Sequence, residues 1–235
     1  MWEKYWIWKM NINLADDEEM LNDSINKSNL LFKAIIIDWG GVFTPQRENS
    51  KATRKLEKEF KITKGTLCKR IYNNEYWMKA QIGELSDYEF WKLTLQQFNI
   101  FSDKGIIEFK NKLFKDEKEK LKKDMVKLVK KLKNYYRIVL LTNADNLFRD
   151  LLVNMYRVDS LFDEIIISSE VGYAKPNPNI FFIACKSLDL KTEEYIFIDD
   201  SIKNVQSAEN IGIKSIVYKN TSLLKKGLKK NGIIF

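Results

Sequence analysis

Three short apolar runs, each of which stops at a polar residue, constrain the fold of this chain most strongly. Residues 35–37, 139–141 and 196–198 consist of isoleucine, valine, leucine and phenylalanine. They are followed directly by Asp38, Thr142 and Asp199. Such runs are typical of strands that are buried on both faces of a parallel sheet. Because ligands of open α/β sheets bind beyond the carboxyl ends of the strands, we expect these polar side chains to meet in one crevice.

The C-terminal half of the chain alternates between strand-like and helix-like segments. Strands are expected at residues 33–38, 137–141, 164–167, 195–198 and 214–218, and helices at 145–155, 178–187 and 202–210. Residues 223–235 are too mixed to assign. This alternation implies an α/β fold with a Rossmann-like parallel sheet and helices on both faces.

A long segment without strand-like runs interrupts this pattern after the first strand. Its apolar spacing predicts helices at residues 51–60, 66–72, 88–98 and, as one lysine-rich amphipathic helix, 110–133. Ser86 is the expected N-cap of the third helix, and Glu89 completes its capping box. We therefore predict an inserted helical cap domain. The predicted parts are an N-terminal extension at residues 1–30, a core at 31–46 and 132–235, and the cap at 47–131.

Composition excludes several classes of function. The chain has no histidine, so imidazole bases and His-ligated zinc are excluded. Cys68 and Cys185 form neither a disulfide framework nor a metal-ligand spacing, which indicates a cytoplasmic protein. The net charge of +8 is spread over lysines interleaved with acids, so we expect no nucleic-acid partner.

The N-terminal segment also bears on partners. Residues 1–10 contain three tryptophans and a tyrosine, but they are too short and polar to span a membrane and lack the pattern of a signal peptide. We expect no membrane association. Docking on the chain's own core, or on a second copy as a homo-oligomer, is the expected role of these aromatic residues.

The polar groups after the apolar runs suit an anionic substrate held with a divalent cation. Asp38 is a candidate nucleophile, although a carboxylate there could also cap a turn. Gly40 and Gly41 are expected to let the backbone turn sharply. Asp199 and Asp200 would repel each other at a half-buried strand end without a cation, and hard oxygen ligands favour Mg²⁺.

Four motifs, at residues 35–42, 139–143, 174–176 and 196–201, resemble in order and spacing those of the haloacid dehalogenase superfamily, subfamily I with a helical cap. The similarity covers roughly residues 31–218. It implies a phosphatase that binds Mg²⁺ and forms an aspartyl-phosphate on a small phosphorylated metabolite. The implied catalytic residues are Asp38, Thr142 and Lys175, the substrate-binding residues are Thr142, Asn143 and Lys175, and the metal ligands are Asp38, the Gly40 carbonyl, Asp199 and Asp200. Ser201 and Asn204 match positions that orient the acids.

One departure from the family pattern lies in the first motif, which has the variant form Asp-x-Gly-Gly-Val. Phosphatases of the family usually carry a second Asp, their general acid and base, where this chain has Gly40. The resemblance reaches phosphatases of sugar phosphates with such a variant, and it implies a working but slow enzyme. A non-catalytic binding or regulatory protein is the alternative. A dehalogenase ranks lower, because the family's dehalogenases lack the acid pair that this chain keeps. Candidates to line the entrance to the site are Trp39, Phe43, Glu84 and Tyr88.

Overall fold

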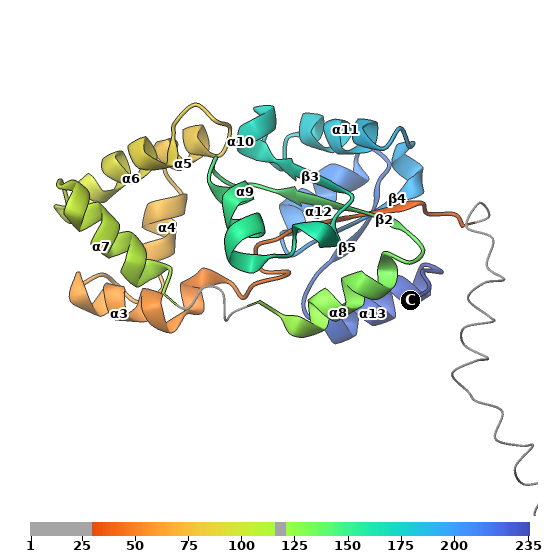
Figure 1. The fold of residues 1–235 in the computed structure, drawn as a ribbon, viewed down its shortest axis with the longest axis horizontal. Helices are drawn as coiled ribbons and strands as arrows, with labels where there is room; N and C mark the ends of the chain where they lie inside the picture. Colours follow the sequence, from red (N-terminus) through yellow and green to blue (C-terminus); the bar gives the residue numbers. More distant parts are fainter. Residues whose placement is uncertain (1–29, 116–120) are drawn as a thin grey trace, which may run out of the picture. The chain divides into compact units, whose positions relative to one another are not determined.

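A computed structural model describes residues 30–115 and 121–235 of the chain. Residues 1–31 and 32–235 form two separate units. The predicted N-terminal extension, with its aromatic residues, therefore lies almost entirely outside the described residues. The second unit contains the sheet and the helices that are drawn in colour in Figure 1.

The core of this unit is a five-stranded parallel sheet with the strand order β3-β2-β1-β4-β5. Its strands are β1 (Ala34–Ile37), β2 (Arg137–Thr142), β3 (Glu164–Ile167), β4 (Tyr195–Asp199) and β5 (Lys214–Val217). The predicted α/β fold is confirmed, and every predicted strand lies within one or two residues of its observed position. In the central strand, Ile37 pairs with Leu140 on one side and with Ile198 on the other. The residues that come after these three strands therefore emerge at the same edge of the sheet.

Helices cover both faces of the sheet. One face packs against α11 (Pro178–Ser187) and α12 (Ile202–Glu209) through a cluster that includes Ile36, Val139 and Phe197 from the strands and Phe181 from α11. Figure 1 shows α8 (Lys123–Leu132) and α13 (Thr221–Lys230) on the opposite side of the sheet. Shorter helical segments are α9 (Phe148–Asp150), η5 (Leu151–Tyr156), η6 (Asp159–Leu161), α10 (Ser168–Val171) and η7 (Thr192–Glu194). All four residues of β1 are buried. Because successive side chains point to opposite faces of a strand, β1 is covered on both faces.

Between β1 and α8, the described residues contain helical segments and no strand, as predicted. The helical segments are η2 (Arg47–Asn49), α3 (Lys51–Glu59), α4 (Leu67–Tyr72), α5 (Glu75–Ala80), α6 (Asp87–Leu95), η3 (Gln96–Phe98) and α7 (Asp103–Leu113). They share a hydrophobic cluster of their own, whose fully buried aromatic residues include Phe90, Trp91 and Phe109. The capping box of α6 is confirmed, because Ser86 Oγ accepts from Glu89 N and Ser86 N donates to Glu89 Oε2. The boundaries of the cap at residues 47 and 131 stay predictions.

The structure differs from the sequence-based expectation in two helices. The lysine-rich segment is not one helix, because α7 ends at Leu113 and α8 begins at Lys123. Lys122 is extended there, and its backbone N–H donates to the Phe43 carbonyl. The unassigned C-terminal segment, residues 223–235, contains most of α13, which Asn220 caps by accepting from Leu223 N. None of the helices in the described ranges is long and apolar enough to cross a membrane.

Candidate active site

Asp38 lies at the end of the central strand, where its backbone N–H donates to the Ile198 carbonyl. The side chain is largely buried, with 11% of its surface exposed. The chain then turns, and both Val42 N and Phe43 N donate to the Trp39 carbonyl. The Trp39 ring stacks on Phe43 at a centroid distance of 5.0 Å and so anchors the turn below the site. Local backbone hydrogen bonds and aromatic packing thus hold the Asp38 carboxylate at the edge of the sheet.

Lys175 joins three of the sequence motifs through one ammonium group. Its Nζ donates to Asp38 Oδ1 and Asp199 Oδ2, both at 2.7 Å, and to the Leu141 carbonyl at 2.8 Å. The three donors of a lysine are therefore all used. Burial lowers the pKa of Lys175, but the two carboxylates outweigh this effect and leave the pKa above its usual value. Lys175 is a fixed positive charge between two buried acids.

The pKa of Asp38 is shifted in the opposite sense from that of an ordinary ion-paired carboxylate. Burial raises it from 3.8 to about 7, Lys175 opposes the rise, and the neighbouring Asp199 adds to it. Three carboxylates, Asp38, Asp199 and Asp200, each offer an oxygen within 4.8 Å of the others. Their mutual repulsion, only partly offset by Lys175, fits a position for one further cation. Hard carboxylate oxygens at this spacing suit Mg²⁺.

Asp199 and Asp200 differ in their surroundings. Asp199 is fully buried, and its two oxygens accept hydrogen bonds from Ser201 N, Asn204 Nδ2 and Lys175 Nζ. Asp200 is partly exposed and accepts from Gln46 Nε2 at 3.1 Å. Asn204 contacts Asp199 through its side chain, whereas Ser201 does so through its backbone N–H. Asp199 thus has its hydrogen-bonding capacity largely filled by the protein, and Asp200 is the more accessible acid.

The two glycines after Trp39 have different backbone conformations. Gly41 has a φ of +71°, and a Cβ there would lie 1.8 Å from Asp200 Oδ2. Gly40 has no such left-handed φ, and the nearest atom to its added Cβ would be Asp38 Oδ2 at 4.0 Å. The Gly41 carbonyl accepts from Lys122 Nζ at 2.6 Å. The sharp turn expected of both glycines is therefore a property of Gly41, and Gly40 has room for a side chain.

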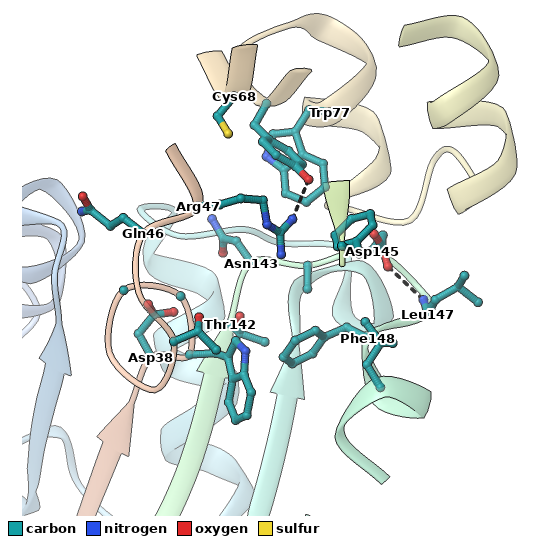
Figure 2. Close-up of a pocket in the computed structure, with 18 of the residues that line it drawn as sticks. Asp38, Gln46, Arg47, Cys68, Trp77, Thr142, Asn143, Asp145, Leu147 and Phe148 are labelled. Atoms are coloured by element: carbon teal, nitrogen blue, oxygen red, sulfur yellow. Dashed lines mark hydrogen bonds between the residues drawn. The ribbon is translucent and has the colours of Figure 1, made fainter. Parts of the chain in front are cut away.

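The side chain of Asn143 is used inside the protein. Its Nδ2 donates to the Lys175 carbonyl at 2.7 Å, and its Oδ1 accepts from Lys175 N at 2.8 Å. This pair of hydrogen bonds fixes the segment that carries Lys175 against the end of β2. Thr142 is buried and lines the pocket beside Asp38 (Figure 2). Whether Thr142 and the Asn143 backbone bind substrate stays a prediction.

A pocket of about 590 Å³ extends from Asp38 and Lys175 to the helices between β1 and β2. Six of the seven predicted site residues line it together: Asp38, Gly40, Thr142, Asn143, Lys175 and Asp200. The seventh, Asp199, is fully buried and does not line the pocket. Of the candidates for the entrance, Trp39 lines the pocket. Phe43 is buried in the core, and Glu84 and Tyr88 do not contribute to the lining.

The pocket is also lined by residues that the sequence did not single out, most of them away from the acid cluster. They are Gln46, Arg47, Glu48, Tyr72, Trp77, Asp87, Lys110, Asn111, Phe114 and Asp145. Most are isolated polar or aromatic residues on helices or loops, where no motif marks them. Asp145 is an exception, since it lies three residues after Thr142 at the same strand end. Its position beyond β2 was the available indication that it faces the crevice.

Comparison with known proteins places these features in a family. Residues 32–212 match the family model of haloacid dehalogenase-like hydrolases. Human N-acylneuraminate-9-phosphatase is 27% identical over 115 residues, which cover 48% of this chain and 43% of the human protein. The match thus spans less than half the length of that relative.

Two solved structures share the fold. A predicted haloacid dehalogenase-like hydrolase from Porphyromonas gingivalis has a TM-score of 0.68 and 21% identity, covering 86% of this chain and 98% of the other. A family enzyme from Bacteroides thetaiotaomicron, in complex with magnesium and inorganic phosphate, has a TM-score of 0.64 and 22% identity, covering 82% and 98%. At this low sequence identity, the two structures show only that the fold is shared.

Proposed function

Because the chain belongs to the haloacid dehalogenase-like hydrolases, we propose that it is a Mg²⁺-dependent phosphatase that hydrolyses a small phosphomonoester through an aspartyl-phosphate. The observation that carries this proposal is the Lys175 ammonium held between Asp38 and Asp199, with Asp200 beside them. This arrangement offers a nucleophile, a fixed cation and oxygen ligands at one point. The magnesium and phosphate bound by the Bacteroides enzyme, and the activity named for the human relative, agree with it.

Each residue has a distinct role in the proposed reaction. A carboxylate oxygen of Asp38 attacks phosphorus, the bond between phosphorus and the alcohol oxygen breaks, and water then hydrolyses the aspartyl-phosphate. Lys175 keeps the Asp38 carboxylate oriented through its hydrogen bond to Oδ1. Thr142 and the backbone N–H of Asn143 bind phosphoryl oxygens, and Asn143 positions Lys175 through its side chain. The site thus holds charged groups and hydrogen-bond donors in fixed positions. Such preorganised groups stabilise the charge that develops in a transition state.

We expect the proposed metal ligands to contribute unequally. The residues that would hold Mg²⁺ directly are Asp38, Asp200 and the Gly40 carbonyl, where the ion would offset the charge of the carboxylates and the phosphoryl group. Asp199 supports the site by fixing Lys175, since Ser201 N, Asn204 and Lys175 already donate to it. We expect Asp200→Asn to weaken Mg²⁺ binding in a calorimetric titration without loss of thermal stability. Asp199→Asn should destabilise the fold as well, because it disturbs three buried hydrogen bonds.

The first experiment measures phosphate release from p-nitrophenyl phosphate and from an alkyl phosphate, with Mg²⁺ and with excess chelator. Asp38→Asn is the blank, and Asp150→Asn, an exposed acid that does not line the pocket, is the matched control. Release that requires both Asp38 and the divalent cation supports the mechanism. Phosphate release in excess chelator, or phosphate release by Asp38→Asn, would contradict the mechanism.

Gly40 favours a second candidate, a non-catalytic protein that binds a phosphorylated ligand, because no carboxylate stands there to protonate the leaving oxygen. General acid and base catalysis contributes about 10² to 10⁴ in rate. The space around Gly40 admits a side chain, so Gly40→Asp tests this point directly. For an enzyme that lacks only the acid, Gly40→Asp should raise turnover of alkyl phosphates more than that of aryl phosphates, whose leaving groups need less protonation. A folded Gly40→Asp protein that binds Mg²⁺ and hydrolyses neither substrate would favour the binding protein.

A further inference from the structure

The far end of the pocket contains a carboxyl group, Asp145, that the proposed reaction does not use. Its Oδ1 accepts from Leu147 N at 3.0 Å, which fixes the side chain as an Asx turn. Figure 2 shows Asp145 and Asp38 on opposite sides of the pocket, and both residues line it. Burial raises the pKa of Asp145, and the nearby Asp87 adds to the rise. A positioned acceptor thus faces the part of the cavity beyond the phosphate site.

Hydrogen-bond donors face the same cavity from the helical side. Arg47 Nη1 donates to the Tyr72 hydroxyl at 2.8 Å, and the guanidinium lies 4.4 Å from the ring centroid of Phe114. These contacts fix the plane of the guanidinium, which Figure 2 shows extending over the pocket. Burial raises the pKa of Tyr72 to about 12, so its hydroxyl keeps its proton and can donate while it accepts from Arg47. Trp77 adds an aromatic wall to the pocket.

The charges at this end do not suit a second anionic group. Three carboxylates line it, those of Glu48, Asp87 and Asp145, against the cations of Arg47 and Lys110. Lys110 is already paired with Asp87. A carboxylate or second phosphate on the substrate would meet more negative than positive charge. An uncharged group with several hydroxyls could instead donate to Asp145 and accept from Arg47 and Tyr72.

We propose that Asp145 is a specificity-determining residue, which accepts a hydrogen bond from a hydroxyl of the substrate's leaving group and selects sugar phosphates over phosphorylated acids. This inference rests on the proposed phosphatase function and extends it to the far end of the same pocket. The cavity of about 590 Å³ is of the size that small-molecule sites have, and it leaves room for a sugar beyond the phosphoryl group. A site built to bind a hydroxyl discriminates strongly against analogues that lack it, because its polar groups are then left unpaired.

The test compares three substrates: glucose 6-phosphate, 3-phosphoglycerate and p-nitrophenyl phosphate. Wild-type protein should show a kcat/KM for glucose 6-phosphate at least about ten-fold above that for 3-phosphoglycerate, which carries a carboxylate. Asp145→Asn keeps the Oδ1 acceptor of the turn but replaces the second oxygen by a donor. It should raise the KM for glucose 6-phosphate about ten-fold and leave p-nitrophenyl phosphate unchanged, since one hydrogen bond to a charged group is lost. Asp150→Asn is the control and should change neither.

Three outcomes would overturn the inference. One is a wild-type preference for 3-phosphoglycerate, and another is an Asp145→Asn protein with unchanged kinetics on the sugar phosphate. The third is an equal loss on glucose 6-phosphate and p-nitrophenyl phosphate, which would mark Asp145 as structural only.

A failure of the phosphatase proposal itself would be seen separately, as absence of hydrolysis of p-nitrophenyl phosphate. In that case calorimetric titration of the wild-type protein with glucose 6-phosphate decides the inference. Binding that Asp145→Asn weakens about ten-fold supports it. Absence of binding to wild-type protein, or equal binding to the variant, contradicts it.

Discussion

Replacing Gly41 by alanine should damage the fold and the metal site together. Gly41 has a φ of +71°, and in this left-handed region a Cβ costs about 1–2 kcal/mol. The added atom would also lie 1.8 Å from Asp200 Oδ2 and 2.5 Å from its Cγ. Asp200 must therefore leave its observed position, which disturbs its hydrogen bond with Gln46 and its place beside Asp38 and Asp199.

The expected cost is the sum of these two effects. Displacing the Asp200 side chain from a relaxed rotamer adds about 0.5–1.5 kcal/mol to the backbone strain. The free energy of unfolding should therefore fall by about 1.5–3.5 kcal/mol. For a domain of this size, each kcal/mol shifts the Tm by about 2–4 °C, so the shift is easily measured. Mg²⁺ affinity should fall as well, because Asp200 is a proposed ligand.

Gly40→Ala is the matched control for this experiment. Its Cβ would meet nothing closer than Asp38 Oδ2 at 4.0 Å, and its φ lies outside the left-handed region. Its stability should stay within about 1 kcal/mol of wild type, with a gain expected if only the entropy of the unfolded chain changes. Urea unfolding and calorimetric Mg²⁺ titration measure both quantities. The reasoning is refuted if Gly41→Ala is as stable as Gly40→Ala and binds Mg²⁺ equally well.

The buried charges and one helix cap lead to three further predictions. Lys175→Met should lower the free energy of unfolding in urea by about 3–5 kcal/mol, because it leaves the carboxylates of Asp38 and Asp199 buried without their cation; a loss below 1 kcal/mol, on the order of a surface substitution, would contradict this. In chelator, wild-type Tm should fall more steeply than that of Asp38→Asn as the pH rises from about 4 to 7. The pKa of Asp38 is raised to about 7, so over this pH range the folded state holds a proton there that the unfolded state has lost. Parallel Tm curves for the two proteins would contradict this prediction. Ser86→Ala should cost about 1 kcal/mol in the same urea assay, because Glu89 N loses its acceptor, and an unchanged midpoint would show that the cap contributes nothing.

The sheet could be predicted from the sequence because each strand has its own local pattern. The apolar run before Asp38 ends where its strand ends, and the runs before Thr142 and Asp199 end one residue before their strands do. Ser86 and Glu89 marked a helix start for an equally local reason, since the cap and its partner are three residues apart. The sequence pattern was sufficient to predict those elements that depend on residues close together in the chain.

Features that depend on contacts between distant segments could not be predicted in this way. At the start of α8, the backbone N–H of Lys122 donates to the carbonyl of Phe43, which lies 79 residues earlier in the chain. The different surroundings of Asp199 and Asp200 depend on which of the two Lys175 and Asn204 contact. Arg47 and Tyr72 line the pocket because the helical segments fold over the edge of the sheet, and no spacing in the sequence indicates that contact.

The position of β1 has a consequence for how the protein forms during synthesis. This strand is the first of the sheet to be made, yet it lies in its centre and pairs with β2 and β4, whose registers begin at Arg137 and Tyr195. Contacts between such distant segments form slowly, and domains of this size often pass through intermediates. Until β4 emerges from the ribosome, one edge of an all-apolar strand stays open to pairing with other chains. We therefore expect fragments that end before residue 195 to aggregate, whereas the same chain extended through β4 closes that edge and completes the acid pair at the same step.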